Sequence, residues 1–185
     1  MTTMTATMTA TMTTSATDSV MGLLSEAKEL TEVDQKRLKA VMRRVGWVES
    51  KNTPDAVQHS GGPGRGTYQF ETGGSTKALQ QRLVNFEEVY GDAGLSEEDR
   101  VALSEGDVSK VSEDGQDALV LVDWTMKTPG DEVGELARGL YDPKFFWSTF
   151  HWAGDPKDLK TKHEQWNREM EDYERMGYGR PRGER

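Results

Sequence analysis

Apolar residues recur at helical spacing along most of the chain and predict a series of amphipathic helices. The clearest one begins at Thr31, because Thr31 and Asp34 have the spacing of a capping box. The apolar positions that follow are Leu38, Val41, Met42, Val45 and Val48. They share one face of a helix, and Glu49, four residues after Val45, falls on that face. The pattern therefore predicts a carboxyl group on the apolar side of a helix end.

Further helices are predicted on the same grounds. They cover residues 18–30, 75–90, a short helix opened by a capping signal at 96–99, then 116–127, 131–139 and the region from 155 onward. The segment 116–127 is apolar nearly all round, so periodicity allows a buried strand or a buried helix, and its length favours the helix. The intervening residues 104–117 are acidic and are expected to be exposed.

The long helix is expected to end near Pro54, because a residue that precedes proline disfavours the α region. Residues 55–66 then form a loop that carries the sequence GGPGRG. Such glycine density lets the backbone approach a ligand or another segment closely. Thr67–Phe70 is predicted as a short strand, and little other strand is expected. The predicted fold class is therefore α+β and mainly α, with a very short β element beside the long helix.

The two ends of the chain differ in composition from the middle. Residues 1–17 are a Thr- and Met-rich segment of low complexity, expected to be a disordered tail or an arm that orders on a partner protein. We therefore divide the chain into an arm with a short helix (1–30), one globular domain (31–176) and a basic tail (177–185).

Composition excludes several classes of function. The chain has 185 residues, about one domain, and no cysteine, which rules out disulfides and thiolate metal sites. Its net charge of -9 argues against a nucleic-acid-binding protein. No apolar run is long enough to span a bilayer. The N-terminus lacks the pattern of a signal peptide, so an activity outside the cytoplasm is expected to need another carrier.

Cofactor and metal motifs are also missing. The three histidines, His59, His151 and His163, are scattered and form no zinc-binding motif. The GGPGRG sequence lacks the lysine of a phosphate-binding loop, and no serine-hydrolase elbow occurs. We predict no cofactor and no metal.

The candidate for chemistry is Glu49, next to Trp47 and Val48. Desolvation disfavours the charged form of a carboxyl group, so we expect Glu49 to hold a proton near neutral pH. A glycosidase needs such a group to protonate the leaving oxygen. The alternative is a Glu that caps the helix or pairs with an arginine on its surface.

The residues around Glu49 form an ordered set of elements. In order they are Glu49-Ser50, Asn52-x-Pro54-x-Ala56, a glycine loop and Gly66-x-Tyr68-Gln69-Phe70. This set resembles the catalytic segment of the lysozyme superfamily, with goose-type lysozymes and soluble lytic transglycosylases as the nearest members. The resemblance covers about residues 40–71, and beyond them it is only general. It implies a lysozyme-like helical domain.

The resemblance also implies roles for single residues. Glu49 would be the general acid and then the base, and Ser50 would support the site by hydrogen bonding. Tyr68 and Gln69 would line the cleft and contact an acetamido sugar. The alternative is that Tyr68 is a core residue and Gln69 an exposed strand residue. The far side of the cleft would come from 116–127 or from an aromatic cluster at 141–152, which is otherwise core.

Hydrolysis of a glycoside normally uses two carboxylates, and the candidates for a second are Glu71 and Asp55. The resemblance implies that a lytic transglycosylase needs only one, because the C6 hydroxyl of the sugar attacks and gives a 1,6-anhydro product. The sequence places neither Glu71 nor Asp55 firmly at the cleft, so it favours lytic transglycosylation over hydrolysis.

Two functions remain open. The first is cleavage of the MurNAc-GlcNAc linkage of peptidoglycan by an enzyme that a phage particle carries, its arm bound to other virion proteins. The second is a non-catalytic structural virion protein that keeps a lysozyme-like fold. The joint presence of Glu49, Ser50 and Gln69 favours the enzyme.

Overall fold

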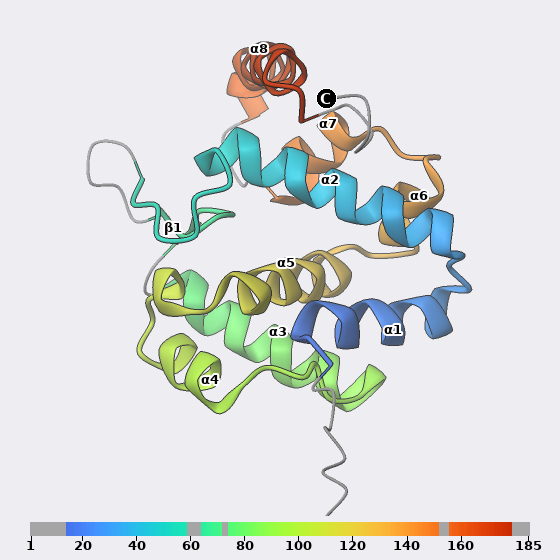
Figure 1. Cartoon of the computed structure of the whole chain (residues 1–185), viewed down its shortest axis with the longest axis vertical. Helices are drawn as coiled ribbons and strands as arrows, with labels where there is room; N and C mark the ends of the chain where they lie inside the picture. Colours follow the sequence, from blue (N-terminus) through green and yellow to red (C-terminus); the bar gives the residue numbers. More distant parts are fainter. Residues whose placement is uncertain (1–13, 59–63, 72–73, 152–155, 179–185) are drawn as a thin grey trace, which may run out of the picture.

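The computed structural model describes residues 14–58, 64–71, 74–151 and 156–178 (Figure 1). These ranges are mainly helical with one small antiparallel sheet, so the predicted fold class is confirmed. The α-helices are α1 (Ala16–Lys28), α2 (Glu32–Ser50), α3 (Gly74–Tyr90), α4 (Glu97–Ser104), α5 (Glu113–Lys127), α6 (Glu132–Arg138), α7 (Pro143–Phe146) and α8 (Leu159–Arg175). The remaining elements are β1 (Gly64–Arg65), β2 (Phe70–Glu71), the 3-10 helices η2 (Val108–Lys110) and η4 (Pro156–Asp158), and the π-helix η3 (Trp147–His151).

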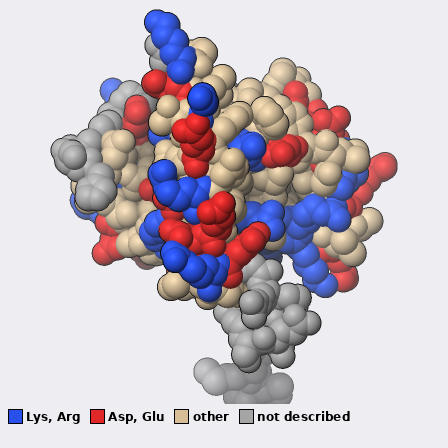
Figure 2. Space-filling model, turned by 90° about the horizontal axis from the view of Figure 1, so that it is seen from above, with Lys and Arg blue, Asp and Glu red and all other residues tan. Residues whose placement is uncertain are grey.

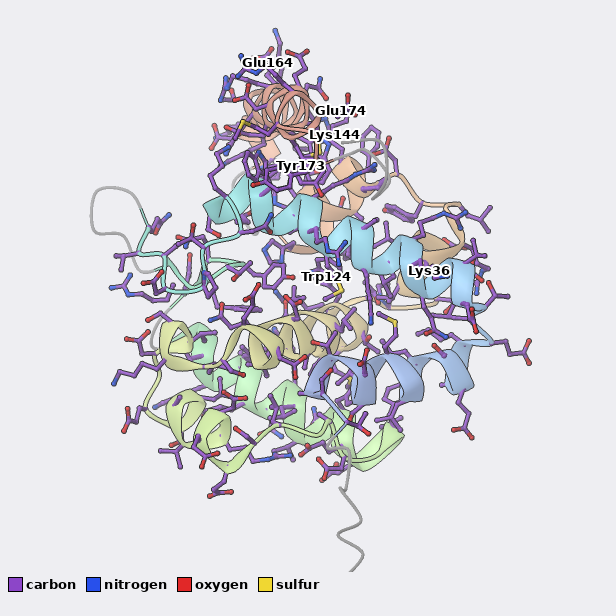
Figure 3. The ribbon with its side chains drawn as sticks, viewed as in Figure 1. Lys36, Trp124, Lys144, Glu164, Tyr173 and Glu174 are labelled. Carbon is purple, nitrogen blue, oxygen red and sulfur yellow. The ribbon has the colours of Figure 1, made fainter. Side chains whose placement is uncertain are left out.

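Helix α5 is the centre of the core. Its residues 118–122 and Trp124 are completely buried, and α1 and α3 both pack against it. In Figure 1, α2 lies above α5, α3 and α4 lie below it, and α8 lies above α2. Trp124 fills the space between α2 and α5, while Tyr173 lies between α8 and α2 (Figure 3). The helix predicted for 116–127 is confirmed, since α5 covers these residues. A helix that is apolar all round is stable only when it is covered on every side, which explains its central position.

Two predicted capping signals have different outcomes. At α2 the capping box is complete, because Thr31 Oγ1 accepts from the Asp34 backbone N–H and the Asp34 carboxylate accepts from that of Thr31. At α4, Ser96 Oγ accepts from the Asp99 N–H at 3.0 Å. The Asp99 carboxylate does not reach back, however. It accepts from Ser112 N and Oγ at 2.7 and 2.8 Å and so fastens α4 to the start of α5.

The strand predicted for Thr67–Phe70 is wrong. Gly66 and Gln69 have φ angles of 75° and 51°, which turn the chain instead of extending it. The two-residue strands flank this turn, and the register pairs Gly64 with Glu71 and Arg65 with Phe70. The turn is therefore the tip of a short hairpin beside the C-terminal end of α2 (Figure 1).

The acidic stretch 104–117 is not exposed throughout, which corrects a second prediction. Val108 and Gln116 are completely buried, since η2 and the first turn of α5 pack into the core. Some acidic side chains of this stretch are nevertheless exposed, as Glu105 and Glu113 show.

Helix α1 belongs to the helical domain. Val20 and Leu24 are completely buried, and the Asp114 carboxylate accepts from Ala16 N at 2.6 Å. The sequence division at residue 30 groups this helix with the N-terminal arm, whereas its packing places it against α5. Residues 1–13 of that arm and residues 179–185 of the basic tail lie outside the described residues. No helix in the described part of the chain is long and apolar enough to cross a membrane.

Candidate active site

Glu49 is the penultimate residue of α2, and 18% of its side chain is exposed. One carboxylate oxygen, Oε1, accepts a hydrogen bond from Trp147 Nε1 at 2.6 Å. Oε2 accepts no hydrogen bond from any residue that the structure describes. The expected position on the apolar side of the helix end is confirmed, and one oxygen is held while the other remains available.

A π-helical turn supplies the contacts to this carboxyl group. Trp147 and His151 stand four residues apart at its two ends, and His151 Nε2 lies 3.9 Å from Glu49 Oε1. π-Helical turns are rare and occur often at functional sites. Here the turn directs an indole and an imidazole toward the end of α2.

His151 is held as a neutral ring. Trp124 Nε1 donates to His151 Nδ1 at 3.1 Å, and His151 Nε2 lies 3.0 Å from the carbonyl oxygen of Tyr68. Both contacts are satisfied only when the proton is on Nε2, which donates to that carbonyl. Burial lowers the pKa of His151, against the opposite influence of the Glu49 carboxylate. Glu49 therefore has a neutral neighbour at neutral pH.

Ser50 connects the end of α2 to the hairpin. Its hydroxyl donates to the Thr67 carbonyl oxygen at 2.8 Å and accepts from Thr53 N at 3.0 Å. The hydrogen bonds of Ser50 thus go to the backbone around Glu49 and not to Glu49 itself. The serine positions the turn that lies opposite the carboxyl group.

Gln116 fastens the same turn from the side of α5. Its Oε1 accepts from Thr67 N at 2.7 Å, and its Nε2 donates to the carbonyl oxygens of Pro54 and Val111, both at 2.9 Å. The side chain is completely buried. Gln116 is absent from the site residues predicted from sequence, although a glutamine at the start of an apolar helix is a signal of a buried polar contact.

Tyr68 is a core residue whose ring borders a cavity in front of Glu49. Only 2% of it is exposed, and its hydroxyl donates to Asp117 Oδ1 at 2.6 Å. Burial, followed by the nearby Asp117 carboxylate, raises the pKa of Tyr68 well above its usual value. Burial also raises the pKa of Asp117. The hydroxyl is therefore protonated, and its proton is already donated to Asp117.

Gln69 also borders the cavity and is half-buried. Its Nε2 donates to the Gly66 carbonyl oxygen at 2.9 Å, so this nitrogen stabilises the turn. Its Oε1 accepts no hydrogen bond from the described residues. That oxygen is the group that Gln69 can offer to a ligand.

The space in front of Glu49 has a volume of about 300 Å³, and we call it the Glu49 cavity. Residues of α2, the hairpin, α3, α5, η3 and α8 line it. Its polar lining residues are Glu49, Gln58, Gln69, Glu71, Arg82, Asp123, Lys127, His151 and Lys162. The cavity is large enough for a sugar unit and carries both signs of charge.

The cavity lining distinguishes between the two candidates for a second carboxylate. Glu71 borders the Glu49 cavity, whereas Asp55 does not. Asp123 also borders it, but its side chain is only 2% exposed and pairs with Arg82 and Lys127. Besides Glu49, the lining carboxylates are thus Glu71 and Asp123, and Asp123 is held between two cations.

The aromatic cluster predicted at 141–152 is mostly core. Phe146 and Trp147 are buried, Phe145 is half exposed, and Trp152 lies outside the described residues. Trp147 nevertheless contributes its polar edge to Glu49. The spacing of Trp147 and His151 within this cluster was the available signal, but the prediction from sequence treats His151 only as one of three scattered histidines.

Metal ligands are not grouped in the described part of the chain, where no three His, Asp or Glu side chains are arranged to hold an ion.

A scan against protein-family models found no match, and neither did searches of curated proteins and of solved structures. The function must therefore be argued from the site and its sequence pattern.

Proposed function

We propose that this protein cleaves the glycan strand of peptidoglycan between MurNAc and GlcNAc, with Glu49 as its acid–base catalyst. The observation that carries the proposal is the state of that side chain. It is partly buried, held at one oxygen by Trp147, and borders the Glu49 cavity, while the other oxygen accepts no hydrogen bond from the described residues. No lysine or arginine of the described chain forms an ion pair with it.

The reaction that fits best is lytic transglycosylation. Glu49 donates its proton to the glycosidic oxygen, and the bond between that oxygen and C1 breaks. The resulting carboxylate then accepts the proton of the C6 hydroxyl, whose oxygen bonds to C1 and closes a 1,6-anhydro ring. The proton lost in the first step is regained in the second, so no water is consumed and one carboxyl group suffices.

The other residues of the site position the acid and the substrate. Trp147 fixes the Glu49 side chain, which matters because proton transfer requires hydrogen-bond distance to the reacting oxygen. Ser50 and Gln116 hold the turn on the opposite side. The Oε1 atom of Gln69 is an acceptor suited to the N–H of an acetamido group.

The alternative function is a structural virion protein without catalysis. The observation in its favour is that Tyr68 and Gln69 make hydrogen bonds within the protein, to Asp117 and to the Gly66 carbonyl oxygen. A structural protein would keep both contacts but would not need an open carboxyl group over a cavity. Both functions place the chain in a phage particle, and that part of the proposal rests on the sequence.

The decisive experiment incubates purified protein with peptidoglycan of several wall types and analyses the released fragments by mass spectrometry. The proposal predicts fragments with 1,6-anhydro ends. Reducing ends instead would indicate hydrolysis, and Glu71→Gln would then test whether Glu71 is the second carboxylate. Equal inertness of the wild type and Glu49→Gln would favour the structural alternative.

A further inference from the structure

A compact group of charges forms another part of the wall of the Glu49 cavity. It consists of Arg82 on α3 and of Asp123 and Lys127, one turn apart on α5. Arg82 Nη1 lies 2.8 Å from Asp123 Oδ1, and Lys127 Nζ lies 2.7 Å from Asp123 Oδ2. We call these three residues the Arg–Asp–Lys cluster.

The cluster has an excess of positive charge. Two cations share one carboxylate, so the three side chains carry a net charge of about +1 at neutral pH. The carboxylate is almost inaccessible at 2% exposure, whereas the side chains of Arg82 and Lys127 are 29% and 28% exposed. All three residues border the cavity, and the two positive groups are therefore more accessible than the negative one.

Both cations keep hydrogen-bond donors in reserve. A guanidinium group has five N–H donors and an ammonium group has three. Within the described chain, the hydrogen bond of Arg82 and the ion pair of Lys127 both go to Asp123. A guanidinium beside an ammonium is well suited to a carboxylate, since charge-assisted hydrogen bonds are stronger than neutral ones.

The cluster and the catalytic group act on one neighbourhood. The pKa of His151, which lies 3.9 Å from Glu49, responds to the charges of Glu49, Lys127 and Asp123. The remaining charged groups that line the cavity are Glu71 and Lys162, one of each sign. The excess positive charge is therefore local to the part of the wall that Arg82 and Lys127 form.

We propose that the Arg–Asp–Lys cluster binds a carboxylate carried by the saccharide substrate. This inference rests on the proposed function and narrows its substrate to acidic glycans. In peptidoglycan the carboxylate comes from the lactyl ether where the muramic acid carries no peptide, and from the peptide where one is attached, because that attachment converts the lactyl carboxyl group into an amide. A neutral polymer of N-acetylglucosamine offers neither group and would be bound less well.

The test measures binding of three probes to the intact protein, by calorimetry or by NMR titration. The probes are N-acetylglucosamine, N-acetylmuramic acid and muramyl dipeptide. Because tenfold in affinity corresponds to about 1.4 kcal/mol, one charge-assisted contact predicts about tenfold tighter binding of the acidic probes. A preference for N-acetylmuramic acid identifies the lactyl carboxylate, and a preference for muramyl dipeptide identifies the peptide carboxylate.

Two variants change the cluster charge in opposite directions. Arg82→Gln removes one positive charge and should abolish most of the preference for acidic probes. Asp123→Asn removes the negative charge and should increase that preference severalfold. A purely structural ion-pair cluster predicts the same sign for both, because both variants would disturb the same packing. Lys110→Gln is the matched control, since Lys110 is exposed, pairs with Glu105 and lies outside the cavity.

Equal binding of the three probes, or no binding of any, would overturn the inference. So would a preference that Arg82→Gln and Asp123→Asn shift in the same direction. Failure of the proposed function looks different, because an inert protein can still discriminate between the acidic and neutral probes. An active enzyme that cleaves peptidoglycan and N-acetylglucosamine oligomers equally well would contradict only the inference that the Arg–Asp–Lys cluster binds a substrate carboxylate.

Discussion

Trp147 Nε1 donates a 2.6 Å hydrogen bond to Glu49 Oε1 and so joins two positions that are 98 residues apart in the chain. The indole comes from the π-helical turn η3, and the carboxyl group comes from the last turn of α2. The same indole packs against Trp166 of α8, with ring centroids 5.4 Å apart. The orientation of the acid therefore depends on the correct docking of the C-terminal part of the fold onto α2.

This relationship predicts the effect of Trp147→Phe. Phenylalanine keeps an aromatic ring but lacks the N–H that holds Oε1. A hydrogen bond to a charged group contributes about 1.5–3 kcal/mol, so we expect peptidoglycan cleavage to slow by at least about tenfold. The measurement is kcat with a soluble glycan substrate, accompanied by the thermal midpoint. Trp166→Phe is the matched control, because it perturbs the same aromatic pair without touching Glu49.

A rate for Trp147→Phe within twofold of the wild type would contradict this role. An equal loss in both tryptophan variants would assign the effect to packing.

The lowered pKa of His151 predicts how stability depends on pH. Since burial disfavours the charged ring in the folded protein, the unfolded chain binds the proton first as the pH falls through about 6.5. Stability from this group is thus present above that pH and is lost below it. His151→Gln should reduce the loss of unfolding free energy between about pH 8 and about pH 5.5.

The control for this prediction is His163→Gln, because His163 does not border the Glu49 cavity. Asp117, whose pKa burial raises, acts with the opposite sign but is present in every variant compared. Identical pH profiles for wild type and His151→Gln would show that His151 makes no such contribution.

Gln116 predicts a large loss of stability on replacement. Gln116→Leu leaves the Thr67 N–H and the carbonyl oxygens of Pro54 and Val111 without their partner. A buried group left unsatisfied costs about 1–3 kcal/mol, so the free energy of unfolding should fall by at least about 2 kcal/mol. Urea unfolding measures it, and Gln81→Leu on the exposed side of α3 should change it by less than about 0.5 kcal/mol.

Two glycines predict opposite outcomes for the same substitution. Gly66 has a φ of 75°, and a Cβ there would lie 2.5 Å from Gln116 Oε1. Gly66→Ala should therefore destabilise the hairpin by more than about 1 kcal/mol. Gly22 lies exposed within α1, and a Cβ there meets nothing within 4 Å, so Gly22→Ala should stabilise by about 0.5–1 kcal/mol. Thermal unfolding of both variants decides, and a shift of the same sign in each would contradict the account.

The helices could be predicted from sequence because each carries its own signals. Thr31 and Asp34 mark the start of α2, and the continuous apolar run of 116–127 marks a helix covered on all sides. The hairpin could not be predicted in the same way. Its shape depends on a positive φ at Gln69, a non-glycine residue, and on the clamp from Gln116, 49 residues from Thr67.

The candidate site divides along the same line. Glu49, Ser50, Gln69 and Glu71 could be predicted because they lie within or just after one contiguous segment. Trp147, His151 and the Arg–Asp–Lys cluster could not, since only the packing of α3, α5 and η3 around the end of α2 brings them to the cavity. Figure 2 shows acidic and basic side chains interspersed over the face that carries α8, so surface charge gave no pointer to the site either.

We propose that one carboxyl group, that of Glu49, performs the chemistry. The most direct measurement compares the rate at which wild-type protein and Glu49→Gln release soluble fragments from purified peptidoglycan. Glutamine keeps the acceptor for Trp147 and the fold, but it cannot donate and regain a proton. The account predicts release by the wild type and a loss of at least about a hundredfold in the variant. Release at similar rates by both proteins would contradict it.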